Sequence, residues 1–461
     1  MKDKKDKKDK NKKISKSKNK KISKSKNKKI SKSKNKKISK SNNKIYIGVL
    51  VVVVAVFGTS IFYANQLERI VEEIIIAPYP EQPNLDYELP SNHPNIFVNQ
   101  SGYEIGSEMS AIFQGGNGLK SFEVVDSNTK QVVYRGELSP LTSNIETDLS
   151  IGIFSSVIKE GEYYIRADYI GQSYPFWIHD KVQEDLFKST YYATLDRIVV
   201  EDSLVAKVDL AIPILVAYEF YPMNFTDDTG IEDSGNKIPD MLDVLYIVAK
   251  EIEELVDAQL ELEVEEQYKI SGFLAKFGML YESYDSSEGS KYMRLGHTIW
   301  SNILDQEESM SRYFAACELY RSLGGSQYHN VVKEYKSIEV TDYDEDSIYK
   351  LYGDLSYLQS NRSTDWNYCN ALMEERIERT LSIATNVREM DNLALGIDEE
   401  QMLYNSFELI IIIQVLVSHE YRTMLEDQLT YFGGVNSEGM NYIEQIKDAP
   451  FFLLMMCDMI T

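Results

Sequence analysis

The sequence predicts a multidomain chain, with a single transmembrane helix near the N-terminus, a small β-sandwich, and then a mainly α-helical domain. Three observations predict this class: an uncharged stretch at 45–64, strand-like segments within 96–180, and helical periodicity within 181–461. An uncharged apolar stretch of about 20 residues suits a bilayer, and strands and helices differ in the period of their apolar residues.

Charge divides the chain at the predicted membrane helix. The whole chain has a net charge of −23, but residues 1–44 alone hold 22 Lys and 3 Asp. Their net charge is +19, so residues 45–461 carry a net charge of −42. Lys-rich flanks tend to stay in the cytoplasm. We therefore expect the N-terminus to be cytoplasmic and the acidic domains to be extracytoplasmic.

Residues 45–64 read IYIGVLVVVVAVFGTSIFYA. A helix of this length, rising 1.5 Å per residue, spans a hydrocarbon core of roughly 30 Å. A cleaved signal peptide is the alternative, with an apolar core of about 7–15 residues followed by small residues. Ile61, Phe62 and Tyr63 are bulky at that place. We therefore interpret the segment as the uncleaved anchor of a single-pass cell-membrane protein.

The tail, residues 1–44, is a low-complexity repeat. NKKISKSK begins at Asn11, Asn19 and Asn27, and NKKISKSN begins at Asn35. One Ile per unit cannot form a core. Anionic lipid headgroups are the expected partner, at about 1 kcal/mol per Lys near the surface. The alternative is a solvated topology signal. No nucleic acid is expected, because no aromatic residue is interleaved for base stacking.

Residues 65–95 form a predicted linker, in which 77–95 contain five Pro. The next segments are rich in β-branched and aromatic residues and are separated by turn signals such as Asp126-Ser127-Asn128. Such short strands predict a β-sandwich. The segments are FEVVD, QVVYRGEL, GEYYIRADY and SYPFWIH.

From residue 181 apolar residues recur at helical spacing, which predicts at least seven or eight helices around a common core. FELIIIIQVLV within 405–421 is apolar on every side, so we expect it to be central, and it is too short for a second membrane span. The helical segments are 210–221, 241–259, 309–324, 347–359, 370–384 and 405–421.

Cysteine and histidine give no sign of a cofactor or metal site. Cys317, Cys369 and Cys457 cannot all pair, and their spacing suits neither a metal nor a redox motif. We expect them to be buried, inert thiols. The sequence has no HExxH, GxSxG, GxxxxGK[ST] or EF-hand pattern, so no metal and no cofactor are predicted.

Several motifs resemble those of one known family. IFVNQSGY at 96–103 resembles the opening strand of the immunoglobulin-like (Ig-like) domain that precedes many family 9 glycoside hydrolases. DSGNKIPDMLD at 233–243 resembles the family's Ser-Gly-Asn-x-Ile-Pro-Asp-x-Leu-Asp-Glu, with Val244 in place of the last Glu. YFGGVN at 431–436 resembles its Tyr-Leu-Leu-Gly-Arg-Asn, and DAPF at 448–451 its final helix.

This resemblance implies a fold and a chemistry. It implies an Ig-like sandwich at 96–180 and an (α/α)6 toroid of six helical hairpins at 181–461. The family consists of inverting endo-β-1,4-glucanases, so a β-glucan-like polysaccharide is the implied partner. Inversion needs a base and an acid carboxyl group roughly 6.5–9.5 Å apart.

The catalytic base motif of the family, Asp-Ala-Gly-Asp, is missing from residues 193–216. The nearest carboxylates there are Asp196, Glu201, Asp202 and Asp209. Glu201 and Asp202 are the candidates for a catalytic role. The alternative is that they cap a helix N-terminus, where carboxylates are favourable.

The family's acid is a Glu in Asn-Glu-x-Ala, at the place where this sequence has Asn441 and Tyr442. A phenol, with a pKa of about 10, is a poor substitute for a carboxylic acid. Glu444 is the candidate for a displaced acid, and a surface Glu is the alternative. The linker between the last two motifs is only 437–447, so we expect a shallow cleft.

Sugar rings stack on aromatic side chains, and Trp366 and Tyr368 are candidates for substrate binding. The alternative is that Trp366 covers the core.

The sequence leaves three functions open. The preferred one is a membrane-anchored, cellulase-like pseudoenzyme that handles β-glucan. The others are an active hydrolase with relocated carboxylates, such as Asp202 and Glu444, and a structural partner in a surface-polysaccharide membrane complex.

Overall fold

The structure is a computed structural model. It describes residues 94–115, 119–141, 149–228, 234–258, 262–303, 308–338, 340, 343–390, 399–416, 418–436, 438–443 and 449–460. The predicted tail and transmembrane helix lie outside these residues, as does the linker up to residue 93. Within the described ranges, no helix is long and apolar enough to cross a membrane. All described elements belong to one compact unit within residues 86–461.

The strands form an antiparallel sandwich, with one parallel pair between β2 and β9. The strand order is β1-β3-β6-β5-β4-β7-β9-β2, and the long strand β5 pairs with both β4 and β6. The strands are β1 (Ile96–Phe97), β2 (Tyr103–Glu104), β3 (Ser110–Gln114), β4 (Ser121–Asp126), β5 (Val132–Pro140), β6 (Leu149–Ile153), β7 (Gly161–Ala167), β8 (Gly171–Gln172) and β9 (Phe176–His179).

Alternation along the strands builds the sandwich core. In β7, Tyr163 and Ile165 are buried while Glu162, Tyr164 and Arg166 lie on the other face. This is the period of two that a sheet with one solvated face requires. The buried residues include Phe113, Phe122, Phe154 and Phe176. The β-sandwich that the sequence predicts is confirmed.

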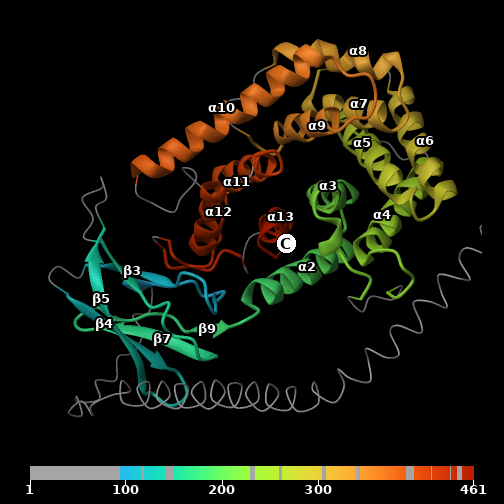
Figure 1. Cartoon of the computed structure of the whole chain (residues 1–461). Helices are drawn as coiled ribbons and strands as arrows, with labels where there is room; N and C mark the ends of the chain where they lie inside the picture. Colours follow the sequence, from blue (N-terminus) through green and yellow to red (C-terminus); the bar gives the residue numbers. More distant parts are fainter. Residues whose placement is uncertain are drawn as a thin grey trace, which may run out of the picture. The chain divides into compact units, whose positions relative to one another are not determined.

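The helical domain is a ring of hairpins, in which odd-numbered helices lie inside and even-numbered helices outside (Figure 1). The helices are α2 (Val182–Val200), α3 (Leu204–Phe220), α4 (Asp240–Asp257), α5 (Val264–Tyr281), α6 (Ser286–Asn302), α7 (Met310–Ser322), α8 (Ser326–Glu334), α9 (Ile348–Leu358), α10 (Trp366–Met390), α11 (Glu399–Ile413), α12 (His419–Phe432) and α13 (Ala449–Ile460). The short 3-10 helices are η1 (Pro222–Asn224) and η2 (Tyr335–Ser337).

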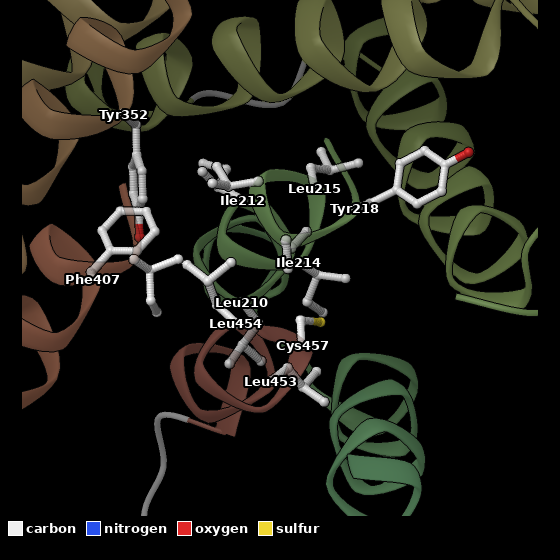
Figure 2. Packing of buried hydrophobic residues seen from close by; sticks show 14 of the residues in the cluster. Leu210, Ile212, Ile214, Leu215, Tyr218, Tyr352, Phe407, Leu453, Leu454 and Cys457 are labelled. Carbon is white, nitrogen blue, oxygen red and sulfur yellow. The ribbon is translucent and has the colours of Figure 1, made fainter. Parts of the chain in front are cut away.

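The inner helices close on themselves. α3 packs between α5 and α13, and α7 packs between α5 and α9. α11 packs on α13, and the ring of Tyr352 on α9 meets the ring of Phe407 on α11 edge-on at 5.9 Å. Side chains from α3 and α13 fill the centre, among them Leu210, Ile214 and Leu454 (Figure 2). A helix that is apolar all round is expected in such a buried position.

One predicted helix is wrong in its second half. The segment 405–421 reads as continuous, but α11 ends at Ile413 and α12 begins at His419. The hydroxyl oxygen of Ser418 accepts a hydrogen bond from the backbone N–H of Tyr421, so Ser418 caps the start of α12. Val415 and Leu416 between the helices are exposed. The first half is buried in the ring, so its predicted central position is confirmed.

The sandwich is hydrogen-bonded to the linker between α12 and α13. The backbone N–H of Gln100 donates to the carbonyl of Gly433 at 2.7 Å, and its side-chain amide donates to the carbonyl of Gly439 at 2.8 Å. The amide of Asn441 donates to the hydroxyl of Ser101 at 3.3 Å. Two of the motifs noted in the sequence, IFVNQSGY and YFGGVN, therefore bind each other.

The SGNKIPD motif shapes the turn that begins α4. The side-chain amide of Asn236 donates to both carboxylate oxygens of Asp243, at 3.1 and 3.0 Å. Its carbonyl oxygen accepts the backbone N–H of Ile238 at 2.7 Å. This segment follows the C-terminus of α3, so in this structure its side chains fix a turn between two helices.

Candidate functional site

Four inner helices run in the same direction. Lys276 of α5 forms ion pairs with Glu219 of α3 and, at 3.1 Å, with Glu318 of α7. Ser356 of α9 donates to Glu318. All four residues lie in the last two turns of their helices. The linkers before α3, α5, α7 and α9 therefore meet at one end of the ring, which we call the N-terminal end, and the linkers after them meet at the C-terminal end.

A carboxylate on an inner helix lies near the N-terminal end. The hydroxyl of Tyr349, in the first turn of α9, donates to Oδ1 of Asp209 on α3. Nζ of Lys269 on α5 lies 3.4 Å from the same oxygen and 4.8 Å from the centre of the Tyr349 ring. Three inner helices therefore hold one carboxylate. Its side chain remains 42% exposed, whereas Lys269 and Tyr349 are largely buried.

The electrostatics of this group keep the phenol protonated. Burial raises the pKa of Tyr349 well above its ordinary value, and the charge of Asp209 adds to the effect. Tyr349 is thus a permanent donor, and Lys269 supplies a cation. The second carboxylate oxygen of Asp209 can accept a hydrogen bond from a water molecule or a sugar hydroxyl. In the sequence, Asp209 was only one of four candidate carboxylates near the position of the family's base.

Glu201 and Asp202 lie in the linker between α2 and α3, also at the N-terminal end. The carboxylate of Glu201 accepts the backbone N–H of Ser203 at 3.0 Å, and Asp202 is exposed. The cap of α3 is Ser203, whose hydroxyl oxygen accepts the N–H of Ala206. The catalytic role of Glu201 and Asp202 stays a prediction. The alternative role, capping the N-terminus of α3, is filled by the neighbouring Ser203.

Tyr442, at the place of the family's acid, binds a carboxylate. Its hydroxyl donates to Oε2 of Glu438 at 2.8 Å. Burial and the hydrogen bond to Glu438 raise the pKa of Tyr442 above its ordinary value. Asn441 beside it is buried against the sandwich. Glu444 lies outside the described residues, so its predicted role is neither supported nor opposed.

Trp366 and Tyr368 follow α9, so they lie toward the C-terminal end of the ring. The structure therefore does not bring them together with Glu201 and Asp202. The two aromatic residues also differ in exposure: Trp366 is 74% exposed, whereas Tyr368 is 6% exposed. The hydroxyl of Tyr368 lies 3.0 Å from that of Tyr313 on α7. Its side chain is packed inside the protein.

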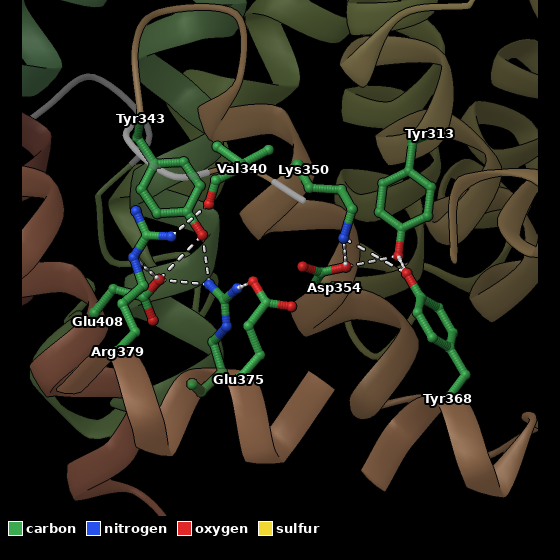
Figure 3. Close-up of polar contacts among 10 residues, drawn as sticks. Tyr313, Val340, Tyr343, Lys350, Asp354, Tyr368, Glu375, Arg379 and Glu408 are labelled. Carbon is green, nitrogen blue, oxygen red and sulfur yellow. Dashed lines mark hydrogen bonds and ion pairs between the residues drawn. The ribbon is translucent and has the colours of Figure 1, made fainter. Parts of the chain in front are cut away.

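Tyr368 belongs to the first of two buried polar clusters around α9, α10 and α11 (Figure 3). In that cluster, Asp354 accepts hydrogen bonds from Lys350 at 2.6 Å and from Tyr313 at 2.7 Å. In the second, Glu408 pairs with Arg376. Neither cluster was predicted from the sequence, although charged residues in the otherwise apolar helices α9 and α11 were a visible signal.

These clusters are held inside the protein. Burial raises the pKa of the Glu408 carboxyl, while Arg376 and Arg379 act in the opposite direction. Asp354, Arg376 and Glu408 are at most 1% exposed. A polymer cannot reach such groups, so we interpret them as ties between helices.

In the part of the chain that the structure describes, no group of three or more His, Cys, Asp or Glu could hold a metal ion. Cys317 and Cys457 are buried, as the sequence predicts, and burial raises the pKa of the Cys457 thiol to about 12. Cys369 is only partly buried.

Comparison with known proteins identifies the two domains. Residues 91–172 match the family model of the cellulase N-terminal ig-like domain. The structure is similar to a metagenome-derived glycoside hydrolase family 9 endoglucanase, with a TM-score of 0.64 and 16% identity over 76% of this chain and 85% of that chain. The chain has an Ig-like domain of cellulase type and a family 9 fold.

Two further solved structures share this family 9 fold. A family 9 glycoside hydrolase of Bacteroides ovatus has a TM-score of 0.59 and 14% identity over 76% of this chain and 86% of that chain. A single mutant of a thermostable endoglucanase from Alicyclobacillus acidocaldarius has a TM-score of 0.57 and 14% identity over 76% of this chain and 83% of that chain. No curated protein matches the sequence. The predicted resemblance to a family 9 glycoside hydrolase with an N-terminal Ig-like domain is confirmed.

Proposed function

We propose that this chain is a membrane-anchored, extracytoplasmic, cellulase-like protein that handles β-glucan or a related polysaccharide, with hydrolysis lost or much reduced. The family 9 fold supports a polysaccharide as the proposed partner, since the solved structures with this fold include endoglucanases. The uncharged segment 45–64 and the charge reversal across it support the anchor.

The pairing of Tyr442 with Glu438 carries the proposal that hydrolysis is lost. A general acid must be protonated and must also release its proton near neutral pH. A phenol whose pKa is raised by burial and by a carboxylate holds its proton instead. The neighbouring carboxylate Glu438 is already engaged with that phenol, so it is not poised as the acid.

The described carboxylate nearest to the role of catalytic base is equally ill-suited to it. Among the carboxylates noted in the sequence, Asp209 is the one that an inner helix presents near the N-terminal end. Its Oδ1 is already bonded to Tyr349 and lies close to Lys269. Such a carboxylate is better suited to orient a sugar hydroxyl than to take a proton from water, because one of its two oxygens is already held by Tyr349 and Lys269.

The test uses the full-length chain, purified in detergent and incubated with amorphous cellulose and with soluble mixed-linkage β-glucan. We expect the protein to be retained on the polysaccharide without release of new reducing ends. Release of reducing ends that disappears in Asp202→Ala, Asp209→Asn or Glu444→Ala would contradict the proposal. It would favour the alternative of an active hydrolase with relocated carboxylates.

The proposed topology has its own test. Protease added to intact cells should degrade the acidic domains and spare the Lys-rich tail, detected with an epitope at each end of the chain. Protection of the acidic domains in intact cells, with degradation only after lysis, would contradict the extracytoplasmic location.

A further inference from the structure

One face of the sandwich presents aromatic and charged side chains on adjacent strands. Glu162, Tyr164 and Arg166 of β7 alternate with the buried Tyr163 and Ile165, so they share the solvated face. Residues directly opposite each other in an antiparallel pair point to the same side of the sheet.

The pairing extends this face over four strands. Trp177 of β9 lies opposite Glu162, and Glu123 of β4 lies opposite Arg166. On the far side of β4, Glu123 lies opposite Arg135 of β5. We call this set of residues the outer face: Glu123, Arg135, Glu162, Tyr164, Arg166 and Trp177.

Trp177 is the aromatic centre of the outer face. It is 53% exposed, although its neighbours Phe176 and Ile178 are fully buried. Tyr164 is the diagonal neighbour of Trp177 across the β7–β9 pair, at about 7–8 Å between backbones. Nζ of Lys130 lies 5.3 Å from the centre of the Tyr164 ring. Two aromatic rings on one solvated sheet offer stacking surfaces that the core does not use.

Charged side chains beside the rings are already fixed in position. The Glu123 carboxylate accepts hydrogen bonds from Arg135 at 2.9 Å and from Arg166 at 2.8 Å. This bridge ties β5, β4 and β7 together on the outer face. Donors and acceptors held in this way lose little conformational entropy when a ligand binds them.

We propose that the outer face binds a single β-1,4-linked glucan chain, with a pyranose ring stacked on Trp177 and sugar hydroxyls bonded to Glu162 and Arg166. This inference rests on the proposed function and adds a second place, away from the ring, where the polysaccharide is held. A β-1,4-glucan is an extended ribbon with apolar ring faces and hydroxyl edges, which suits a flat face of alternating aromatic and polar groups.

Charge favours a neutral polymer as the occupant. The two acidic groups of the outer face, Glu123 and Glu162, balance its two basic groups, Arg135 and Arg166, and Lys130 beside Tyr164 adds one positive charge. A partner rich in phosphate or carboxylate groups would need a clear excess of positive charge. The sandwich is also bonded through Gln100 to the linker that holds Tyr442. A glucan held on the outer face therefore remains tethered to the helical domain.

The experiment measures binding of cellohexaose to the full-length chain in detergent by isothermal titration calorimetry. Trp177→Ala should raise the Kd by about tenfold, because it removes the stacking surface. Trp177→Tyr should restore most of the affinity, and Tyr164→Ala should weaken it less than Trp177→Ala. Ile158→Ala is the matched control: Ile158 is 71% exposed in the loop before β7, and its loss should leave the Kd unchanged.

The outcomes separate this inference from the proposed function. If the wild-type chain binds neither cellohexaose nor cellulose, the proposed function fails. If it binds them and Trp177→Ala binds equally well, the outer face is not the site and only this inference fails. Tighter binding of polygalacturonate than of cellohexaose would overturn the choice of a neutral glucan. A change from dimer to monomer in Trp177→Ala with unchanged affinity would assign the face to a second copy of the chain.

Discussion

Tyr349 on α9 donates its phenol proton to the carboxylate of Asp209 on α3, although 140 residues separate the two. The pair joins two inner helices that are not neighbours in the ring, since α5 and α7 lie between them. Lys269 of α5 joins the same carboxylate. The hydrogen bond thus links the first and fourth inner helices near the N-terminal end.

Removing the phenol hydroxyl should weaken this link. Tyr349→Phe should lower the free energy of unfolding by about 1 kcal/mol, the net contribution of a typical hydrogen bond whose acceptor remains solvated. Urea unfolding of the full-length chain, followed by near-UV circular dichroism, measures the change. Asp209→Asn keeps an acceptor oxygen but removes the charge that faces Lys269, so it should cost at least as much. Equal stability of wild type and Tyr349→Phe would show that the bond does not stabilise the ring.

The buried pair of Arg376 and Glu408 should respond far more strongly. Glu408→Gln removes one charge and leaves Arg376 buried with too little compensation, which typically costs about 3–5 kcal/mol. The matched control is Glu184→Gln, because Glu184 pairs with Lys181 at 3.7 Å and both side chains are more than half exposed. That change should cost less than about 1 kcal/mol. Similar unfolding midpoints for the two variants would contradict this reading of the buried pair.

Asp427 on α12 should make stability depend on pH. Burial, and the nearby carboxylates Glu426 and Glu108, raise the pKa of Asp427 to about 6. The folded state therefore holds this proton more tightly than the unfolded state, whose carboxyl has a pKa of about 3.9. The stabilisation is fully present below pH ~4 and is lost as pH rises through about 6.

The test compares unfolding free energies of wild type and Asp427→Asn at pH 4 and pH 7. Asn does not titrate, so the variant does not lose this stabilisation as pH rises. The change in its free energy of unfolding from pH 4 to pH 7 should be more favourable than that of the wild type by about 1–2 kcal/mol. Glu108→Gln removes one of the two neighbouring charges and should give a smaller difference of the same sign. Parallel pH profiles for wild type and Asp427→Asn would rule out the raised pKa.

Gly434 lies where the sandwich meets the helical domain. It has φ +124°, and an added Cβ would lie 2.9 Å from the carbonyl oxygen of Val98 and close to the Gln100 amide. Gly434→Ala should therefore destabilise the chain by about 1–3 kcal/mol and speed proteolysis between the domains. Gly171→Ala is the control, because Gly171 also has positive φ but its Cβ would meet nothing within 4 Å. Equal effects of the two changes would show that the clash is unimportant.

Local patterns in the sequence predicted much of the fold. The β-branched and aromatic residues of GEYYIRADY identified β7, and helical spacing identified α3, α4, α7, α9 and α10. The break at Ser418 was missed because the apolar run continues through Val415 and Leu416, and only the capping hydrogen bond reveals the start of α12. A capping serine followed by a polar turn is a weak signal beside a strongly apolar stretch.

Contacts between distant residues could not be read from the sequence. Asp209 and Tyr349 meet only because the ring closes, and no local spacing relates them. Tyr368 was a candidate for substrate binding, and its burial beside the hydroxyl of Tyr313 on another helix could not be read from the sequence. Trp177 was not among the candidates from the sequence, because only the pairing with Glu162 places its side chain on the solvated face.

The central claim, binding of β-glucan without hydrolysis, is tested most directly by a proton NMR time course of cellohexaose with the full-length chain. The account predicts broadened cellohexaose signals, which report binding, and no shorter oligosaccharide after prolonged incubation. New α-anomeric signals from shorter products would contradict it, since they are the mark of an inverting hydrolase.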